Sequence, residues 1–343
     1  MLISDFDFDL PEDLIAQIPL ENRQDSRMLV VGRSSQTLEN RAFSDISSYL
    51  TSGDLVVVNN TRVFPARLSG RSETGAQIET FLVEEIENGI WLTLAKPARR
   101  LRPGKKIIFG NRLIGEVLEK NADGKVVIKY QSDGDFDEIV QAIGKTPLPP
   151  YIKRGEMNID SDRERYQTIY AKESGAIAAP TAGLHFTPAV VDDIRTAGAE
   201  IAEITLHVGY GTFEPVRVDD LSEHSVAAER FEISESTADL LNKAKDENRR
   251  IIAIGTTTTR ALESSFEKHS RFAAGRASAG LTITPGYTFR AVDAMLTNFH
   301  LPKSSLLVLV STFGGHELIM EAYKHAVKSR YRFYSYGDCM LIL

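Results

Sequence analysis

The chain has 343 residues, a formal net charge of −7, and 42% hydrophobic against 25% charged residues. These proportions are typical of a globular protein in water, and the length favours two domains. The single cysteine, Cys339, excludes an internal disulfide and disfavours an iron–sulfur cluster on the chain's own thiols. No signal peptide is visible and no apolar stretch is long enough to cross a bilayer, so we expect a cytoplasmic protein without a membrane partner.

The first 62 residues contain few strong signals. Pro11 opens a short predicted helix over 11–16, and an apolar strand is predicted over 55–58. The strand ends in the polar sequence Asn59-Asn60-Thr61-Arg62. Asparagine and threonine after an apolar strand usually form a turn, so we expect one there.

Between residues 63 and 135 short β-type runs alternate with turn signals. The predicted strands are 66–71, 77–84, 90–95, 106–109, 113–119 and 125–130. Asn88-Gly89 and Asp123-Gly124 are strong hairpin signals between them. Six short strands without a long helix predict a small closed barrel, because closure leaves no unpaired strand edge.

The proline-rich segment 146–151 is stiff and is predicted to link the barrel back to the first domain. After it the pattern becomes α/β. The predicted elements are a helix over 188–197 capped by Thr187, a strand over 199–208, a helix over 235–248 capped by Ser234, a strand over 251–254 and an apolar helix over 306–310.

The predicted fold class is therefore α/β, with two domains. A mixed, mostly parallel sheet-and-helix domain is formed by residues 1–62 and 151–343. A small six-stranded β-barrel domain, residues 63–150 with the linker, is inserted into it. In such sheets ligands bind at the carboxyl ends of the strands.

Three runs place a histidine beside glycine, threonine or serine. They are 179–187 with His185, 207–213 with His207, and 297–305 with His300. Small residues let the backbone approach a ligand, and core packing prefers apolar residues, so these runs indicate a site. His207 and a further run, 255–260, both fall at the ends of predicted strands.

Each run also has a structural interpretation. His185 precedes a helix start, which suits a carboxylate or phosphate; the alternative is a helix-capping loop with a structural histidine. The residues that can complete such an anion site are Thr181, Gly183 and Thr187. Gly209 and Gly211 are weak evidence for a nucleotide, because glycine pairs also mark turns.

Two further groups can bind polar ligands. Thr256 and Arg260, after the strand 251–254, can contact phosphate or ribose hydroxyls, or simply form a threonine-rich helix cap. Lys303, close to His300, can bind a carboxylate or phosphate, or lie exposed in a polar turn. No histidine pair has the spacing of a zinc site with a third ligand, so no metal is predicted.

Two basic runs without acids occur in this acidic chain. The first contains Lys96, Arg99, Arg100, Arg102, Lys105 and Lys106, and the second contains Lys324, Lys328, Arg330 and Arg332. One such run is typical of a solvated surface. Two together favour contacts with nucleic-acid phosphates.

With Phe8-Asp9-Leu10-Pro11 near the start and the run 331–338 near the end, these motifs resemble the S-adenosylmethionine:tRNA ribosyltransferase-isomerases of queuosine biosynthesis. The resemblance spans nearly the whole chain. It implies an inserted six-stranded β-barrel and transfer of a ribosyl group from S-adenosylmethionine to 7-aminomethyl-7-deazaguanine at the tRNA wobble position. The ribosyl group is rearranged to give epoxyqueuosine, and adenine and methionine leave. S-adenosylmethionine is consumed, no cofactor is implied, and we expect a monomer.

The resemblance also implies residue roles. His185, His207 and His300 are the acid–base candidates, with Asp338 as an alternative base. The residues implied to shape the cosubstrate pocket or to bind substrates are Gly209, Gly211, Thr212, Asn60, Thr61, Arg62, Lys303, Tyr336 and Asp338. The two basic runs, Arg330 and Arg332 included, are the candidates for tRNA contacts.

Two positions depart from the resemblance, and two other functions stay open. Ala227 replaces the second histidine of a common His-x-Met-His-x-Glu segment, and Asn60 stands where an aspartate is expected. Either that histidine is dispensable or the activity is altered. The alternatives are a methyltransferase or phosphoribosyltransferase on a parallel sheet, and a non-enzymatic RNA-binding protein.

Overall fold

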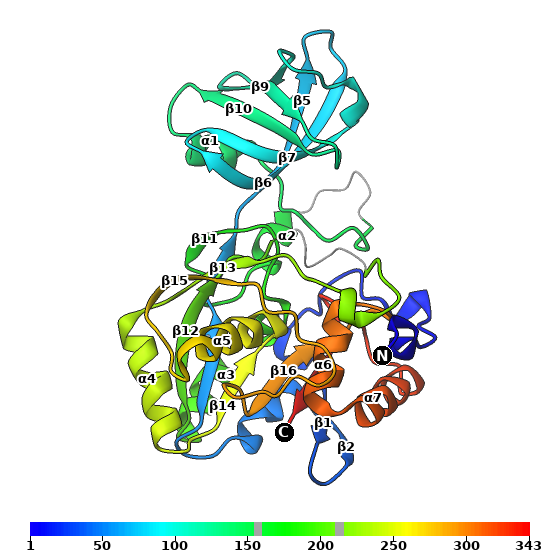
Figure 1. Ribbon diagram of the computed structural model, residues 1–343, viewed down its shortest axis with the longest axis vertical. Coiled ribbons are helices and arrows are strands. Elements are labelled where there is room, and N and C mark those ends of the chain that lie inside the picture. Colours follow the sequence, from blue (N-terminus) through cyan, green and yellow to red (C-terminus); the bar gives the residue numbers. More distant parts are fainter. Residues whose placement is uncertain (154–159, 210–215) are drawn as a thin grey trace.

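A nine-stranded mixed sheet forms the centre of the larger body in this computed structural model, which describes residues 1–153, 160–209 and 216–343 (Figure 1). The strand order is β15-β13-β12-β3-β14-β16-β17-β1-β2. The bounds are β1 (Arg27–Gly32), β2 (Thr37–Ala42), β3 (Leu55–Asn59), β12 (Glu200–Leu206), β13 (Glu229–Ile233), β14 (Ile251–Ile254), β15 (Gly275–Ala279), β16 (Ala294–Asn298) and β17 (Cys339–Ile342).

Parallel pairing accounts for half of this sheet. β12, β3, β14 and β16 are parallel in that order, as are β17 and β1. The pairs β15–β13, β13–β12, β16–β17 and β1–β2 are antiparallel. The predicted mixed sheet is confirmed, with less parallel pairing than expected because antiparallel strands extend both sides. The carboxyl ends of β3, β12, β14 and β16 and the amino ends of β17 and β1 consequently share one edge.

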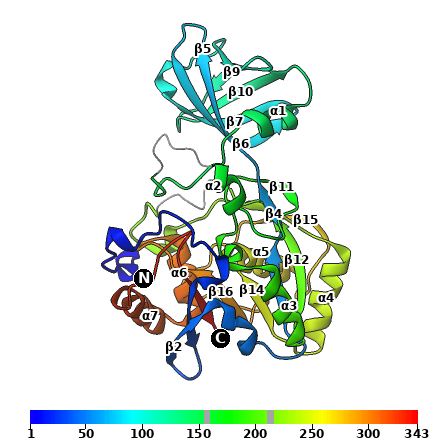
Figure 2. The ribbon, with the colours of Figure 1, turned by 180° about the vertical axis from the view of Figure 1, so that it is seen from behind.

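Helices cover both faces of the sheet (Figures 1 and 2). Their bounds are α3 (Pro188–Thr196), α4 (Glu235–Asp246), α5 (Thr256–His269), α6 (Ser305–Gly314) and α7 (His316–Lys328). One core cluster packs α4 to α7 against Leu55 and Val57. A second packs α3 and a 3-10 segment, Phe43–Tyr49, against Val56 and Val58. Burial on both faces explains why β3 is a continuous apolar run.

The predicted N-caps are confirmed, and one predicted helix is wrong. Thr187 and Ser234 accept hydrogen bonds from backbone amides in the first turns of α3 and α4. Over 11–16 the structure has only a 3-10 turn, Glu12–Leu14. The chain cannot continue as a helix there, because Ile15 forms a β-bridge with a residue near the C-terminus.

The predicted six-stranded barrel is confirmed as a closed antiparallel barrel at one end of the molecule (Figure 1). Its order is β10-β7-β6-β5-β8-β9. The bounds are β5 (Arg67–Ser72), β6 (Gln77–Glu87), β7 (Ile90–Lys96), β8 (Lys106–Phe109), β9 (Leu113–Lys120) and β10 (Val126–Ser132). A helix absent from the prediction, α1 (Phe136–Ile143), adds Ile139 and Val140 to the barrel core.

A two-stranded parallel sheet connects the barrel to the larger body. It pairs β4 (Thr61–Val63) with β11 (Glu173–Ala176), and the helix α2 (Asp160–Arg165) precedes β11 in the chain. β4 continues into barrel strand β5, while the domain limits at 63 and 150 stay a prediction. The other 3-10 segments among the described residues are Ile3–Phe6, Arg23–Asp25, Ala98–Arg100, Thr181–His185 and Leu221–Glu223. Within the described ranges, no helix combines the length and apolarity needed to span a bilayer.

Glu263 ties α5, whose first residue lies at the candidate site, to the loop 287–292. Its carboxylate accepts from one tyrosine hydroxyl and three backbone amides at 2.9–3.0 Å, and the residue is 1% exposed. We expect Glu263→Ala to lower the free energy of unfolding by roughly 3 kcal/mol or more, because three backbone amides, two of them buried, lose their acceptor. Chemical denaturation checks this against Glu267→Ala, an exposed change on the same helix. Equal losses in both variants would contradict it.

Candidate active site

The polar runs of the sequence meet at the shared edge of the sheet. A small cavity of about 50 Å³ there is lined by Thr181, Val208, Thr256, His300 and Tyr334, among others. Each of the runs 179–187, 207–213, 255–260, 297–305 and 331–338 thus contributes at least one residue to its lining. The polar runs therefore gather at the end of the sheet where α/β proteins usually bind ligands.

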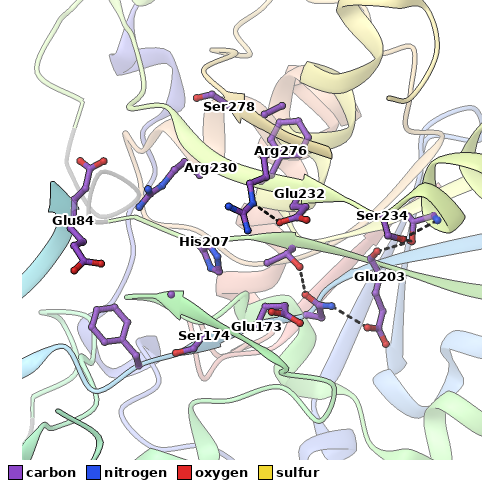
Figure 3. Close-up of a pocket in the computed structure, with 18 of the residues that line it drawn as sticks. Glu84, Glu173, Ser174, Glu203, His207, Arg230, Glu232, Ser234, Arg276 and Ser278 are labelled. Carbon is purple, nitrogen blue, oxygen red and sulfur yellow. Dashed lines mark hydrogen bonds and ion pairs between the residues drawn. The ribbon is translucent and has the colours of Figure 1, made fainter. Parts of the chain in front are cut away.

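A larger cleft lies between the barrel and the sheet (Figure 3). Its volume is about 1410 Å³, and Trp91 and Asp137 line it on the barrel side opposite His207 and Glu232. Pockets for drug-sized ligands have about 300–1,000 Å³, so this cleft has room for a nucleoside and the small cavity does not. Its charged lining residues are Glu84, Glu85, Asp137, Glu173, Glu203 and Glu232, with Arg230 and Arg276.

His207 is the predicted histidine that lines this cleft. Its half-buried ring follows β12, and its Nδ1 lies 2.8 Å from Thr61 Oγ1. Gly175 packs against the ring: a Cβ there would lie 2.8 Å from His207 Cε1, and the φ of +146° also favours glycine. Burial, with the charge of Arg230, lowers the pKa of His207, so the imidazole is neutral at neutral pH.

His185 and His300 are buried instead. His185 is 3% exposed, its Nδ1 lies 2.9 Å from Ser26 Oγ, and burial lowers its pKa to about 4. His300 is 6% exposed, its Nε2 lies 2.9 Å from Thr297 Oγ1, and burial lowers its pKa to about 3. The cavities beside them have only about 20 and 50 Å³. The geometry therefore favours His207 over the other two as an acid–base residue.

Arg260, predicted to bind substrate, is engaged with protein groups. Its Nη1 lies 3.0 Å from Glu229 Oε2, and its other nitrogens donate to the carbonyls of residues 227, 279 and 281. The second carboxylate oxygen of Glu229 accepts from the Gly209 amide at 2.9 Å. Arg260 and Glu229 together hold the backbone two residues beyond His207.

The turn predicted over 59–62 is wrong, because the chain continues from Thr61 as strand β4, paired with β11. The segment after β3 places its residues in three environments. Asn60 lines the cleft, and its side-chain amide hydrogen-bonds to two side chains of β12. Thr61 is fully buried behind His207, and Arg62 is exposed on β4. The predicted loop residues Gly211 and Thr212 lie outside the described residues.

The other predicted substrate-binding residues also have protein partners. Thr187 caps α3, and Gly183 packs tightly under a tyrosine hydroxyl. Lys303 forms an exposed ion pair and Tyr336 a buried hydrogen bond with carboxylates, at 2.7 and 3.1 Å. Asp338, 2% exposed, accepts from two backbone amides at 3.0 and 2.8 Å, and burial raises its pKa. Asp338 thus holds the backbone, which disfavours it as the alternative base.

The two basic runs differ in how freely their side chains can contact phosphates. In the barrel run Lys96, Arg99, Arg100, Arg102, Lys105 and Lys106 are exposed. In the C-terminal run Arg330 forms an ion pair with Asp13 at 2.6 Å, and Arg332 donates to the carbonyl of Ile18. The barrel run is therefore the better candidate for phosphate contacts.

Sequence reasoning missed several residues that shape the site. Gly175 and Ser26 position histidines, and no local pattern marks either of them. Glu229 ends the segment 224–229, and its spacing from His224 could have drawn attention to it. Ala227, in the same segment, lines a cavity of about 30 Å³ with His224, and its carbonyl accepts from the arginine of the buried pair.

The buried histidines predict acid sensitivity. Imidazole titrates near 6.5 in an unfolded chain, whereas burial lowers the pKa of His185 to about 4 and of His300 to about 3. The unfolded state therefore binds protons that the folded state excludes, and stability falls as pH drops below about 6.5. Between about pH 7.5 and 5, one such buried histidine lowers the free energy of unfolding by about 2 kcal/mol.

We expect His300→Gln to lose less unfolding free energy than the wild type over this pH range. Chemical denaturation at each pH measures the loss. His325→Gln is the matched control, because His325 is half-exposed and contacts Asn40 at the surface. Identical pH dependence in the His300 variant and the wild type would refute the assignment.

Comparison with known proteins shows the family of the chain. Residues 3–342 match the family described as "Queuosine biosynthesis protein". Relatives named S-adenosylmethionine:tRNA ribosyltransferase-isomerase, from Syntrophotalea carbinolica and Staphylococcus haemolyticus, are 50% and 49% identical over 100% of both chains. A crystal structure of S-adenosylmethionine tRNA ribosyltransferase from Thermotoga maritima is 35% identical, with a TM-score of 0.57, and covers 99% of this chain and 100% of its own. The chain therefore belongs to the queuosine biosynthesis protein family, a family of enzymes.

Proposed function

We propose that this protein transfers the ribosyl moiety of S-adenosylmethionine to 7-aminomethyl-7-deazaguanine at the wobble position of tRNA and isomerises it to epoxyqueuosine. Adenine and methionine leave, and no cofactor takes part. The names of the relatives support the two substrates. The observation that carries the proposal is His207, a neutral imidazole on the wall of a cleft of about 1410 Å³.

His207 has the chemistry that the first step needs. The sulfonium of S-adenosylmethionine makes the protons on its neighbouring 5′ carbon acidic. A neutral imidazole can accept one of them as a general base, while the electron pair stays on carbon beside the positive sulfur. Glu173 and Glu232 lie close enough to favour the protonated ring that results.

The charge of the cleft favours a cationic substrate. Two of its six lining carboxylates form ion pairs, Glu203 with Lys172 and Glu232 with Arg276. The other four carboxylates outweigh the positive charge of Arg230, so the lining carries a net negative charge. A cleft with one sign of charge concentrates ligands of the opposite sign, which suits a sulfonium.

The RNA substrate requires a different surface. A wobble base lies in a single-stranded loop, so it can leave its stack at low cost and enter a cleft. The exposed cations of the barrel, near residues 96–106, supply phosphate contacts outside the acidic cleft. We place the reaction in the cytoplasm and take a monomer as the acting unit, without contact with a membrane.

The test is turnover with both substrates. The purified protein is incubated with S-adenosylmethionine and an anticodon stem-loop that carries 7-aminomethyl-7-deazaguanine. We expect adenine, methionine and the increased RNA mass in equal amounts. His207→Gln should lower kcat by about 10²- to 10⁴-fold, the usual contribution of a general base, whereas His325→Gln should not.

The products distinguish the alternatives. Release of S-adenosylhomocysteine would replace the proposal with a methyltransferase. Binding of the stem-loop without consumption of S-adenosylmethionine would favour an RNA-binding protein. Unchanged turnover in His207→Gln would support the proposed activity but would exclude His207 as its general base.

Charge removal on the barrel tests the RNA surface. We expect Arg99→Ala, Arg100→Ala, Arg102→Ala and Lys105→Ala together to weaken tRNA binding. The slope of log affinity against log salt should become shallower by roughly 0.7–0.9 for each phosphate that the variant no longer neutralises. Fluorescence anisotropy over a salt series measures this. The control variant is Lys243→Ala, which removes an exposed positive charge from α4. A slope unchanged by the fourfold variant would exclude this surface.

A further inference from the structure

Thr61 contacts His207 from the side away from the cleft. Its Oγ1 lies 2.8 Å from His207 Nδ1 and 3.3 Å from the backbone carbonyl of Glu173. Thr61 is fully buried, so water does not compete for its hydroxyl. The pairing of β4 with β11 sets this geometry, because its register places Thr61 directly beside Glu173.

These two contacts indicate where the protons of the Thr61 hydroxyl and the His207 ring lie. A hydroxyl donates one proton, and a carbonyl oxygen only accepts. The proton of Thr61 therefore points to the carbonyl of Glu173, and Thr61 Oγ1 accepts from an N–H at His207 Nδ1. In a neutral imidazole the second nitrogen, Nε2, then carries a lone pair. Across the described ranges, no protein group forms a hydrogen bond with Nε2.

We propose that Thr61 is a positioning residue that holds His207 in the Nδ1–H tautomer and leaves Nε2 to accept a proton in the cleft. The catalytic meaning of this tautomer rests on the proposed function, whereas the tautomer itself does not. Gly175 completes the arrangement. A side chain at that position would collide with the ring that Thr61 orients, since its Cβ would lie 2.8–3.0 Å from three ring atoms.

The first test observes the tautomer directly. Histidine labelled with ¹⁵N gives distinct nitrogen shifts for protonated and unprotonated ring nitrogens. His207→Gln identifies the signal of His207 by its loss. In the wild type, at a pH where the ring is neutral, we expect a protonated Nδ1 and an unprotonated Nε2. Thr61→Val, which keeps the shape but removes the hydroxyl, should give a mixture of tautomers, and Thr61→Ser should restore the wild-type pattern.

Thr93→Val is the matched control for this test. Thr93 is also a buried threonine whose hydroxyl donates to a backbone carbonyl, at 2.8 Å, but it lies in the barrel. Its loss should lower stability without a change at His207. A wild-type His207 protonated at Nε2 would overturn the proposal, as would an unchanged tautomer in Thr61→Val.

The second test measures the catalytic consequence. Thr61→Val should lower kcat by about 3- to 10-fold, the scale of one net hydrogen bond, and leave KM for S-adenosylmethionine unchanged. Thr61→Ser should recover most of the loss. A rise in KM with constant kcat would instead make Thr61 a substrate-binding residue. If the wild type shows the expected tautomer but no turnover, the proposed function fails and the assignment of the tautomer stands.

Discussion

The hydrogen bonds of Asn59 hold the wall of the cleft in place. Its buried side chain bonds both backbone groups of Leu206, at 2.9 and 3.0 Å, and its Oδ1 also accepts from the amide of Thr61. β12 is thereby fixed to the end of β3 beyond their regular ladder, and Thr61 is set beside His207. A buried amide tolerates such a position only when its polar atoms are paired. The alignment of His207 thus depends on a side chain that does not line the cleft.

The segment that follows Asn59 also connects the larger body to the barrel. From Thr61 the chain enters β4, pairs with β11, and continues into β5, so the strand that supports His207 also leads to the opposite wall. The amide of Phe64 donates to the carbonyl of Ala176, which extends this support toward the barrel. The cleft is therefore bounded by two bodies, and the short parallel pair of β4 and β11 lies between them. Arg163 of α2 also donates to Gln141 of α1, so hydrogen bonds outside this pair join the two bodies as well.

Local signals predicted the parts of the fold that are local. Turn pairs such as Asn88-Gly89 revealed the barrel, and Thr187 and Ser234 revealed the starts of two helices. β1 and β17 were missed, because they pair across more than 300 residues, Met28 with Cys339, and short apolar runs do not identify distant partners. The polar runs do meet at one edge of the sheet, and the site that they predict there stays a prediction. Their sequences could not rank the histidines, since the burial of His185 and of His207 is set by distant segments.

Burial decides between these histidines because a base must carry the charge of the proton it accepts. His300 is enclosed, and a pKa of about 3 makes it a weak base whose protonated form would lack solvent. His207 is half-buried, which lowers its pKa enough to keep the ring neutral before reaction. After the proposed proton transfer, the remaining solvent access and the nearby carboxylates of Glu173 and Glu232 would favour its charged form. Partial burial thus suits both states of a base, whereas complete burial suits only the neutral one.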